Sequence, residues 1–286
     1  MKKEFKQKFG VELEFEEATP LDVAHSLHKY KDKLGHPISC IEYSIQEYYK
    51  EPRVKDDTKC WHLVDDASVS DTDDEGNIHG GEVISPLFST TPESFKKLRW
   101  CVKALNRAKA TYSQKTGYHV HVDTPNIDRM ILLTIWGMLS SDIYQLFHKR
   151  ISNDYARILY KFGNKTRNTD MLTIIQLILL SNDVCELIDD KYSVLHMYEK
   201  DTCNNNTSIC EFRVAQMEEN PHFISAWTKT CCQIVNEASQ YRDLLDLIEN
   251  ASSSLSLFCL NNKSPCNIKW TRLEEQAINE EVCIYL

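Results

Sequence analysis

The segment FGVELEFE, residues 9–16, decides which kind of fold this chain can adopt. Apolar side chains occupy every odd position, and the even positions carry Glu12, Glu14 and Glu16 after a single glycine. Because successive side chains of a β-strand point to opposite faces, this alternation predicts a strand with one apolar face and one carboxylate face. The apolar face must pack on a core, which leaves the carboxylate face available for chemistry.

Four further segments are predicted to be strands with polar groups on one face, at residues 60–69, 82–88, 118–124 and 208–214. A spacing of two places both polar side chains of a segment on the same side of its strand. If all five strands share one curved sheet, its concave face collects carboxylates, two imidazoles and a guanidinium. The polar residues of the four segments are Asp66, Ser68, Glu82, His119, His121, Glu211 and Arg213.

Long helices are predicted for most of the remaining chain, because it contains few helix-breaking residues. Thr19-Pro20 and Thr91-Pro92 are typical N-cap and N1 pairs, and they predict helices that extend to about residues 34 and 110. Further helices are expected at residues 127–149, 153–161, 169–189, 221–249 and 266–282. A strand is expected at residues 38–49, an exposed acidic loop at 70–77 and a hinge near 252–256. No repeat or linker divides the sequence, so we predict one domain over residues 1–286, with a helical C-terminal portion from about residue 221.

Composition and charge exclude several classes of protein. The chain has 286 residues, of which 42% are apolar and 26% charged, as in globular proteins and unlike disordered or collagen-like ones. Its net charge is −9, so duplex nucleic acid is an unfavourable partner. The most apolar stretches, residues 131–139 and 171–180, are shorter than the ~20 residues of a membrane-spanning helix.

Cysteine usage indicates a reducing compartment. The chain has 11 cysteines without a Cys-x-x-Cys pair, and Cys231 and Cys232 are adjacent. This pattern matches neither a disulfide framework nor a zinc knuckle, and we interpret the adjacent pair as helix packing. The first ten residues contain no apolar stretch typical of a signal peptide, so we expect a cytoplasmic protein.

Each polar motif also has a purely structural explanation. A Glu-x-Glu strand is often the solvated face of an antiparallel sheet, a His-x-His strand can be a polar face, and Glu-x-Arg can be a surface ion pair. The run Asp71–Glu75, in which four of five residues are acidic, suits a solvated loop. Several carboxylates that share one face, however, repel one another unless cations neutralise them. Oxygen-rich sites with one histidine suit Mg²⁺ or Mn²⁺.

Five motifs follow one another along the chain: FGVELEFE, WHLVDDASV, GGEVISPLF, GYHVHVD and CEFRV. In this order, from about Phe9 to about Ala226, they resemble the amidoligase family of carboxylate–amine ligases, which is related to glutamine synthetase and gamma-glutamylcysteine ligase. The Gly-x-His-x-His of residues 117–121 is similar to a strand of glutamine synthetases. Glu211-Phe212-Arg213 followed by Asn220-Pro221-His222-Phe223 is similar to their Glu-x-Arg and Asn-Pro-aromatic motifs.

The resemblance implies an α+β fold, namely a glutamine-synthetase-like catalytic half-barrel of curved antiparallel strands flanked by helices. In such a funnel, ATP enters one end, the carboxylate and amine substrates enter the other, and metal ions lie at the waist. The resemblance therefore implies ATP and Mg²⁺ or Mn²⁺ as cofactors, and small-molecule or peptide carboxylates and amines as substrates. The sequence identifies neither substrate and leaves open whether the chain forms a homo-oligomer.

Five residues are implied by the resemblance to be metal ligands. Glu12, His119 and Glu211 are similar to the ligands of the metal that bridges the ATP phosphates. Glu14 and Glu82 are similar to the ligands of a second metal, nearer the acceptor carboxylate.

Other residues are implied to contact the substrates. His121 is expected to donate to the nucleotide phosphates, and Arg213 to stabilise the transferring γ-phosphoryl group. Asp66 and Ser68 are expected to shape the acceptor site. Looser matches, which leave part of the pocket open, are the substrate or phosphate arginines Arg150 and Arg157, the pair Lys191-Tyr192, and His196.

Such a site suits an ATP- and magnesium-dependent ligase that forms an amide or isopeptide bond. A carboxylate is a poor acyl donor, and transfer of the γ-phosphoryl group converts it into an acyl phosphate that an amine can attack. This transfer requires positioning and charge neutralisation, which two metals and Arg213 would supply. Residues 70–79 and 201–207 are candidates for a lid that excludes water. The alternatives are a phosphotransferase of the same fold, a metal-dependent hydrolase and a non-catalytic binding or scaffold protein.

Overall fold

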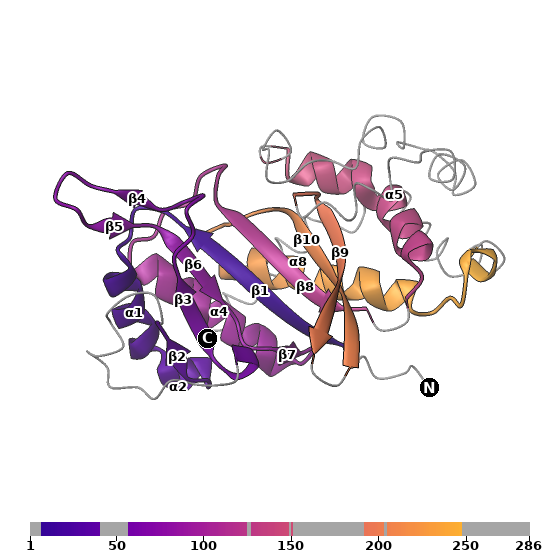
Figure 1. Cartoon of the computed structure of the whole chain (residues 1–286), viewed down its shortest axis with the longest axis horizontal. Coiled ribbons are helices and arrows are strands. Elements are labelled where there is room, and N and C mark those ends of the chain that lie inside the picture. The colour runs from indigo at the N-terminus through magenta and orange to yellow at the C-terminus, as the bar shows by residue number, and fades with distance from the viewer. Residues whose placement is uncertain are drawn as a thin grey trace, which may run out of the picture. The chain divides into compact units, whose positions relative to one another are not determined.

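The computed structural model describes residues 7–40, 57–124, 127–148, 150, 192–202 and 205–247. The chain divides into two compact units: the first comprises Met1–His121 and Ala215–Lys229, and the second Val122–Val214 and Thr230–Leu286. It is a mixed α+β protein with a mostly antiparallel sheet and several helices (Figure 1). The predicted α+β class is thus confirmed, whereas the half-barrel and the single domain remain predictions.

The segment of residues 9–16 forms β1 (Lys8–Phe15), in the middle of the sheet of the first unit. β1 pairs antiparallel with β6 (Gly81–Ile84), which places Glu14 opposite Glu82. Its first residues pair with β7 (Phe88–Ser89). The hydrogen-bonded order is β2-β3-β6-β1-β8, with β2 (Ile38–Ser39), β3 (Trp61–Val64) and β8 (Gly117–Asp123) as the further strands.

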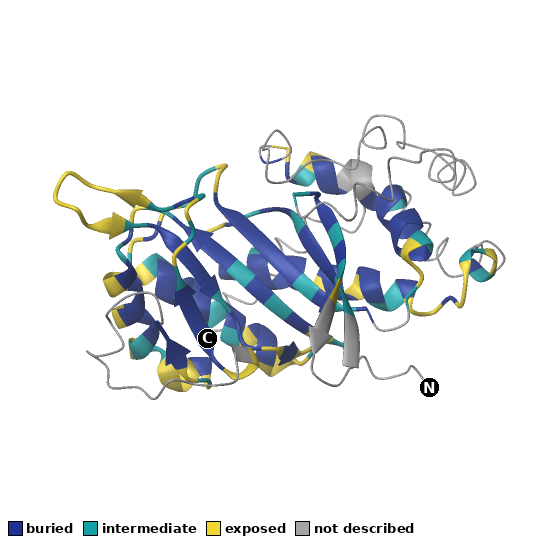
Figure 2. Cartoon of the chain, viewed as in Figure 1, coloured by how far each residue is buried: buried dark blue, intermediate teal, exposed yellow. Residues whose placement is uncertain are grey.

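Alternation along β1 gives the sheet of the first unit one apolar face. The four apolar side chains of β1 are at most 1% exposed, and the strands around them are largely buried (Figure 2). Phe9 stacks on Phe95 of α4 (Pro92–Arg107), with 5.3 Å between ring centroids, and α1 (Pro20–Lys29) packs on α4. The glutamates of β1 therefore lie on the face that α4 does not cover.

Threonine N-caps begin both of these helices, as predicted. Thr19 Oγ1 accepts a hydrogen bond from the Asp22 N–H at 3.1 Å, and Thr91 Oγ1 accepts one from the Ser94 N–H at 3.2 Å. The helix predicted to continue to residue 34 is in fact two helices. The N–H of residue 30 bonds to the carbonyl of residue 27 at 2.9 Å, which ends α1 with a tight turn before α2 (Lys31–Leu34).

The strand predicted at residues 60–69 ends at Val64, so Asp66 and Ser68 lie in a turn and not on a strand. The Asp66 carboxylate accepts the Ser68 N–H at 2.8 Å, and the Asp66 carbonyl accepts the Val69 N–H at 3.0 Å. An aspartate that binds the N–H two residues ahead competes with strand pairing, which explains the early end. The prediction that Asp66 and Ser68 share one face of a strand is therefore wrong.

The acidic loop predicted at residues 70–77 is instead part of a small hairpin. Its strands are β4 (Asp71–Thr72) and β5 (Ile78–His79), which pair antiparallel. Asp73 closes the turn, because its carboxylate accepts the Asn77 N–H at 2.8 Å and its own N–H donates to the Asn77 carbonyl at 3.0 Å. Whether this hairpin acts as a lid stays a prediction.

The second unit contains α5 (Arg129–Leu146), β9 (Leu195–Thr202) and all but the last two residues of β10 (Asn205–Gln216), which pairs with β9 in a hairpin. α5 and the middle of β10 match the predicted helix and strand. β9 was not predicted, and pairs such as Asn206 with Asp201 show that most of the candidate lid at 201–207 is strand. α8 (Pro221–Ala238) is shorter than the predicted helix at 221–249.

Several predictions fall outside the described residues. They concern most of the strand at 38–49, the helices at 153–161, 169–189 and 266–282, the hinge at 252–256, and the residues Arg157 and Lys191. Cys231 and Cys232 are both buried in α8, in agreement with a packing role. Within the described ranges, no helix combines the length and apolarity needed to cross a membrane.

Candidate functional site

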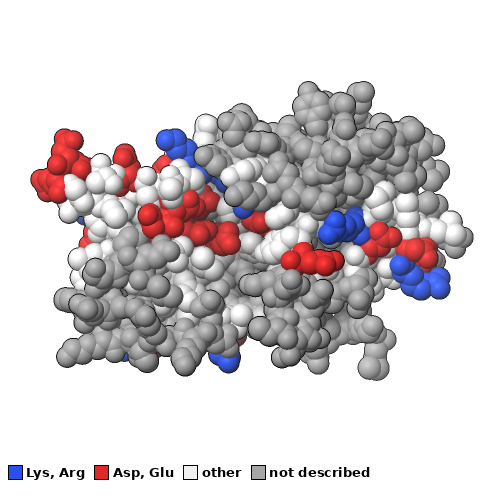
Figure 3. Space-filling model, in the orientation of Figure 1, with Lys and Arg blue, Asp and Glu red and all other residues white. Residues whose placement is uncertain are grey.

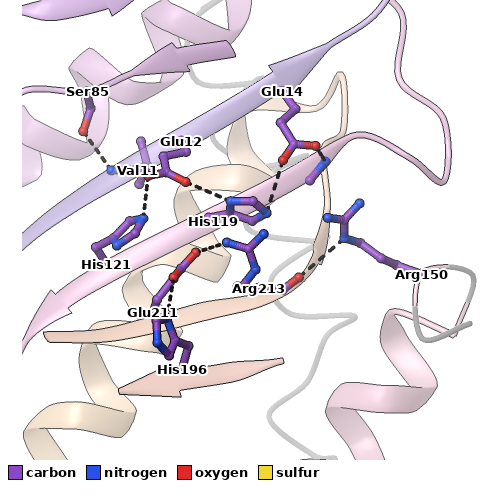
Figure 4. A network of polar contacts seen from close by, with 11 residues as sticks. Val11, Glu12, Glu14, Ser85, His119, His121, Arg150, His196, Glu211 and Arg213 are labelled. Atoms are coloured by element: carbon purple, nitrogen blue, oxygen red, sulfur yellow. Dashed lines mark hydrogen bonds and ion pairs between the residues drawn. The ribbon is translucent and has the colours of Figure 1, made fainter. Parts of the chain in front are cut away.

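β1 and β8 bring two glutamates and two histidines together in the first unit (Figure 4). His119 lies between the glutamates: its Nδ1 is 2.9 Å from Glu12 Oε2, and its Nε2 is 3.3 Å from Glu14 Oε1. His121 Nε2 is 3.0 Å from Glu12 Oε1. These contacts confirm the strand parity from which the four residues were predicted to share a face.

The backbone of the same strands fixes this arrangement. The Val11 N–H donates to the Ser85 hydroxyl at 2.8 Å, which ties β1 to the end of β6. The Gly117 N–H donates to Glu14 Oε2, so β8 orients this carboxylate directly (Figure 4). Glu14 is only 4% exposed, and its position is therefore set by the sheet and not by solvent.

Glu82 joins two groups of side chains whose ligand atoms could hold a metal ion. In one group, ligand atoms of Glu12, Glu82 and His119 all lie within 4.8 Å of one another. In the other, ligand atoms of Glu14, Asp66 and Glu82 do so. Both groups belong to the first unit, and we call them together the carboxylate cluster.

The pKa values of Glu82 and Glu12 are shifted in opposite directions, because their neighbours carry opposite charges. Burial raises the pKa of Glu82 well above its ordinary value, and the neighbouring carboxylates of Glu12, Glu14 and Asp66 raise it further. Burial also opposes ionisation of Glu12, but His121 and His119 hold its pKa well below the ordinary value. The side of the cluster near Glu82 thus has an excess of negative charge, which is an environment that attracts a cation.

The position of Asp66 differs most from the one predicted from the sequence. It was expected to shape the acceptor site from a strand, but it lies in the turn after β3, with its carboxylate next to Glu14 and Glu82. Its partner Ser68 lies on the wall of a separate cavity. The available signal was the pair Asp65-Asp66 directly after a short apolar strand, which is typical of an aspartate turn.

In the second unit, β9 and β10 place His196 opposite Glu211. His196 Nδ1 lies 3.2 Å from Glu211 Oε2, and Arg213 Nη1 donates to Glu211 Oε1, so both carboxylate oxygens of Glu211 have a partner (Figure 4). His196 also stacks on Tyr198, with 5.0 Å between ring centroids. The sequence leaves the role of His196 open, and the structure gives it a contact with Glu211.

Arg150 is a buried cation of the second unit. It is 1% exposed, and its Nε donates to the backbone carbonyl of Arg213 at 3.4 Å. This contact supports the segment that carries Arg213. A role of Arg150 toward a nucleotide stays a prediction.

Comparison with known proteins supplies the remaining evidence. A search of curated proteins finds no match. The model of the family described as "Putative amidoligase enzyme" matches residues 5–235. This range contains every residue of the carboxylate cluster as well as Glu211 and Arg213. The chain therefore belongs to the amidoligase family.

Proposed function

We propose that this protein is an ATP- and magnesium-dependent ligase that joins a carboxylate to an amine through an acyl phosphate. Membership of a ligase family supports the reaction type. The observation that carries the proposal is the carboxylate cluster, in which Glu12, Glu14, Asp66, Glu82 and His119 converge in the first unit.

The donor set of the cluster fits a hard divalent cation. It offers carboxylate oxygens and a single imidazole, which suits Mg²⁺ or Mn²⁺ better than a thiolate-seeking metal. Burial and three neighbouring carboxylates raise the pKa of Glu82, so a cation bound beside it would favour its ionised form. A bound divalent cation would supply charge neutralisation for the phosphates of ATP. We assign Glu12, Glu82 and His119 to one ion, and Glu14, Asp66 and Glu82 to a second.

The other polar residues receive roles toward the substrates. We assign His121 to the nucleotide phosphates and Arg213 to the γ-phosphoryl group, whose charge is redistributed in the transition state. Glu211 would help to hold the metal that neutralises the nucleotide phosphates, as the family resemblance implies. Arg150 is assigned to the nucleotide side of the reaction.

The chemistry proceeds in two steps. A carboxylate oxygen of the first substrate attacks the γ-phosphorus, the bond to the β,γ-bridging oxygen breaks, and ADP leaves with that electron pair. The amine nitrogen then attacks the acyl carbon, and the C–O bond to phosphate breaks. Water would hydrolyse the acyl phosphate, so burial of Glu14 and His119 on the sheet is consistent with a protected reaction centre.

The experiment traps the acyl phosphate with hydroxylamine. The full chain is incubated with Mg²⁺, ATP, pooled amino acids and organic acids, and hydroxylamine, and both ADP and hydroxamate are measured. A ligase forms the two in equal amounts, and only when a suitable carboxylate is present. ADP without hydroxamate indicates an ATPase, and a stable phosphorylated product indicates a phosphotransferase. Glu14→Gln should abolish both signals, whereas Glu75→Gln in the exposed hairpin turn should keep them.

A further inference from the structure

A cavity of about 710 Å³ lies in the first unit beside the β4–β5 hairpin. This volume is in the range of small-molecule sites. Its walls come from the end of β1, the turn after β3, the hairpin and the segment before β8. Its polar lining includes Glu16, Glu17, Ser68, Asp71, Asp73, His79, Ser113 and Lys115.

The cavity adjoins the carboxylate cluster through two elements. Glu16 follows Glu14 and continues the polar face of β1, because residues two apart point to the same side of the chain. On the other wall, the Ser68 N–H donates to the Asp66 carboxylate at 2.8 Å. A molecule in the cavity would thus lie next to the proposed reaction centre.

The walls of the cavity are acidic on balance. His79 Nδ1 lies 2.7 Å from the carbonyl oxygen of Glu17, and its Nε2 lies 3.1 Å from Asp73 Oδ2. Because both partners are acceptors, both ring nitrogens of His79 must donate, so the imidazolium form neutralises Asp73. The carboxylates of Glu16, Glu17 and Asp71 then outnumber Lys115.

Acidic side chains gather on this face of the molecule around the β4–β5 hairpin (Figure 3). The wall also carries hydroxyl groups; that of Ser113 donates to Glu16 Oε1 at 3.1 Å and fixes the orientation of this carboxylate. Carboxylates and hydroxyl oxygens are the acceptors that an ammonium group requires. A substrate carboxylate or a phosphate would be repelled by the same wall.

We infer that this cavity binds the amine substrate, as a small amine that carries at least two positive charges. The reaction of this amine rests on the proposed ligase function, whereas its binding in the cavity does not. One ammonium group would contact the distal acidic wall at Asp71 and Glu17. The other end would face the carboxylate cluster, where the acyl phosphate forms.

The reacting nitrogen must lose its charge before it can attack. The protonated amine R′–NH3⁺ releases one proton, and its lone pair then forms the C–N bond while the C–O bond to phosphate breaks. A second proton leaves the nitrogen of the adduct. Overall, the acyl phosphate and R′–NH3⁺ give the amide, HPO4²⁻ and one proton, which balances atoms and charge.

The test measures amine binding by titration calorimetry on the full chain with Mg²⁺ and ADP. 1,4-Diaminobutane is the dicationic probe, and 1-aminobutane and succinate are the comparison probes. We expect the diamine to bind at least about tenfold more tightly than the monoamine, since it makes one more charge-assisted contact. Asp71→Asn and Glu17→Gln should each weaken diamine binding about tenfold. The matched control Asp74→Asn removes a hairpin carboxylate that does not line the cavity, and it should change binding less than about twofold.

Three results would overturn the inference: no binding of the diamine, equal effects of Asp71→Asn and Asp74→Asn, or tighter binding of succinate than of the diamine. Failure of the proposed function is seen separately. If the diamine binds as expected but no carboxylate yields hydroxamate, the cavity assignment stands and the ligase reaction is wrong. If hydroxamate forms but the diamine does not bind, the ligase reaction stands and the cavity assignment is wrong.

Discussion

Glu82 is the single residue on which both groups of the carboxylate cluster depend. It is surrounded by Glu12, Glu14 and Asp66, and its pKa is raised by burial and by these charges. Glu82→Gln removes the charge of this side chain and its repulsion with the neighbouring carboxylates. The free energy of unfolding of the metal-free protein should therefore stay unchanged or rise. Loss of a group that merely supports a metal ligand typically lowers metal affinity about 10–100-fold, so loss of Glu82, a proposed direct ligand, should weaken Mg²⁺ binding by at least about tenfold. Chemical denaturation and calorimetric Mg²⁺ titration measure the two effects.

Glu12→Gln is the matched contrast, because Glu12 has favourable partners in the metal-free protein. Its contacts with His119 and His121 hold its pKa low, so this variant should lose about 1.5–3 kcal/mol of stability near neutral pH. A lowered pKa means that this stability is present above the unfolded carboxyl pKa and is lost as the pH falls through the folded value. The gap between wild type and variant should therefore close in acid. A stability loss in Glu82→Gln equal to that in Glu12→Gln would contradict the charge assignment.

The proposed roles of Arg213 and Glu211 predict different effects on nucleotide binding and on turnover. Arg213→Ala should lower turnover by roughly 10²–10⁴-fold while metal–ATP affinity stays nearly unchanged, because an electrostatic donor of this kind acts mainly in the transition state. Glu211→Gln should reduce both affinity and turnover. Nucleotide titration and single-turnover ADP formation distinguish these outcomes. A plain strand ion pair would cost less than about 1 kcal/mol and spare activity in both variants.

Strand parity explains why much of the site was predictable from sequence. Glu12, Glu14, His119 and His121 each lie in a strand that alternates apolar and polar residues, so their shared face follows from the pattern. Asp66 could not be placed in this way. Its position depends on a turn, and the distances that bring it to Glu14 and Glu82 are set by tertiary packing.

At the scale of elements, the β4–β5 hairpin depends on one close backbone approach at Gly80. This glycine has φ +87, and a Cβ there would lie 2.4 Å from the Val69 carbonyl oxygen. Gly76, in the hairpin turn, has φ +84, and a Cβ there would meet nothing within 4 Å. Gly76→Ala should therefore lower the free energy of unfolding by about 1–2 kcal/mol, the cost of the left-handed conformation alone.

Gly80→Ala should add an overpacking cost of about 1–3 kcal/mol to the same conformational cost. It should also weaken diamine binding, because the hairpin and residue Val69 form the cavity wall. Thermal unfolding and the amine titration together test the pair. Equal destabilisation by both substitutions would show that the hairpin does not require the close contact between Gly80 and the Val69 carbonyl.

Some helices and strands could be predicted from the sequence, and others could not. Helix starts at Thr19 and Thr91 were predicted because a cap is a local interaction. β9 was missed, although buried Leu195 and Met197 alternate with more exposed residues in it. Its strand character depends on pairing with β10, which is not a local property. The β4–β5 hairpin was missed for a related reason, since its strands are only two residues long.

At the scale of the whole molecule, net charge predicts that the proposed nucleotide binding requires a divalent cation. The chain has a net charge of −9, and the carboxylate cluster adds local negative charge, so ATP without a divalent cation should be repelled. With Mg²⁺, binding to the native state stabilises it by mass action, by about 2.7 kcal/mol at a ligand concentration of one hundred times Kd. This gain corresponds to a rise in Tm of several degrees for a chain of this size. Thermal unfolding should therefore show the largest rise in Tm with ATP and Mg²⁺ together. Mg²⁺ alone should give a smaller rise, and ATP in excess EDTA should give almost none. The Glu82→Gln variant should lose most of the rise seen with ATP and Mg²⁺. An equal shift with ATP in EDTA would mean that the nucleotide binds without a metal, and the assignment of the carboxylate cluster to metal binding would then be wrong.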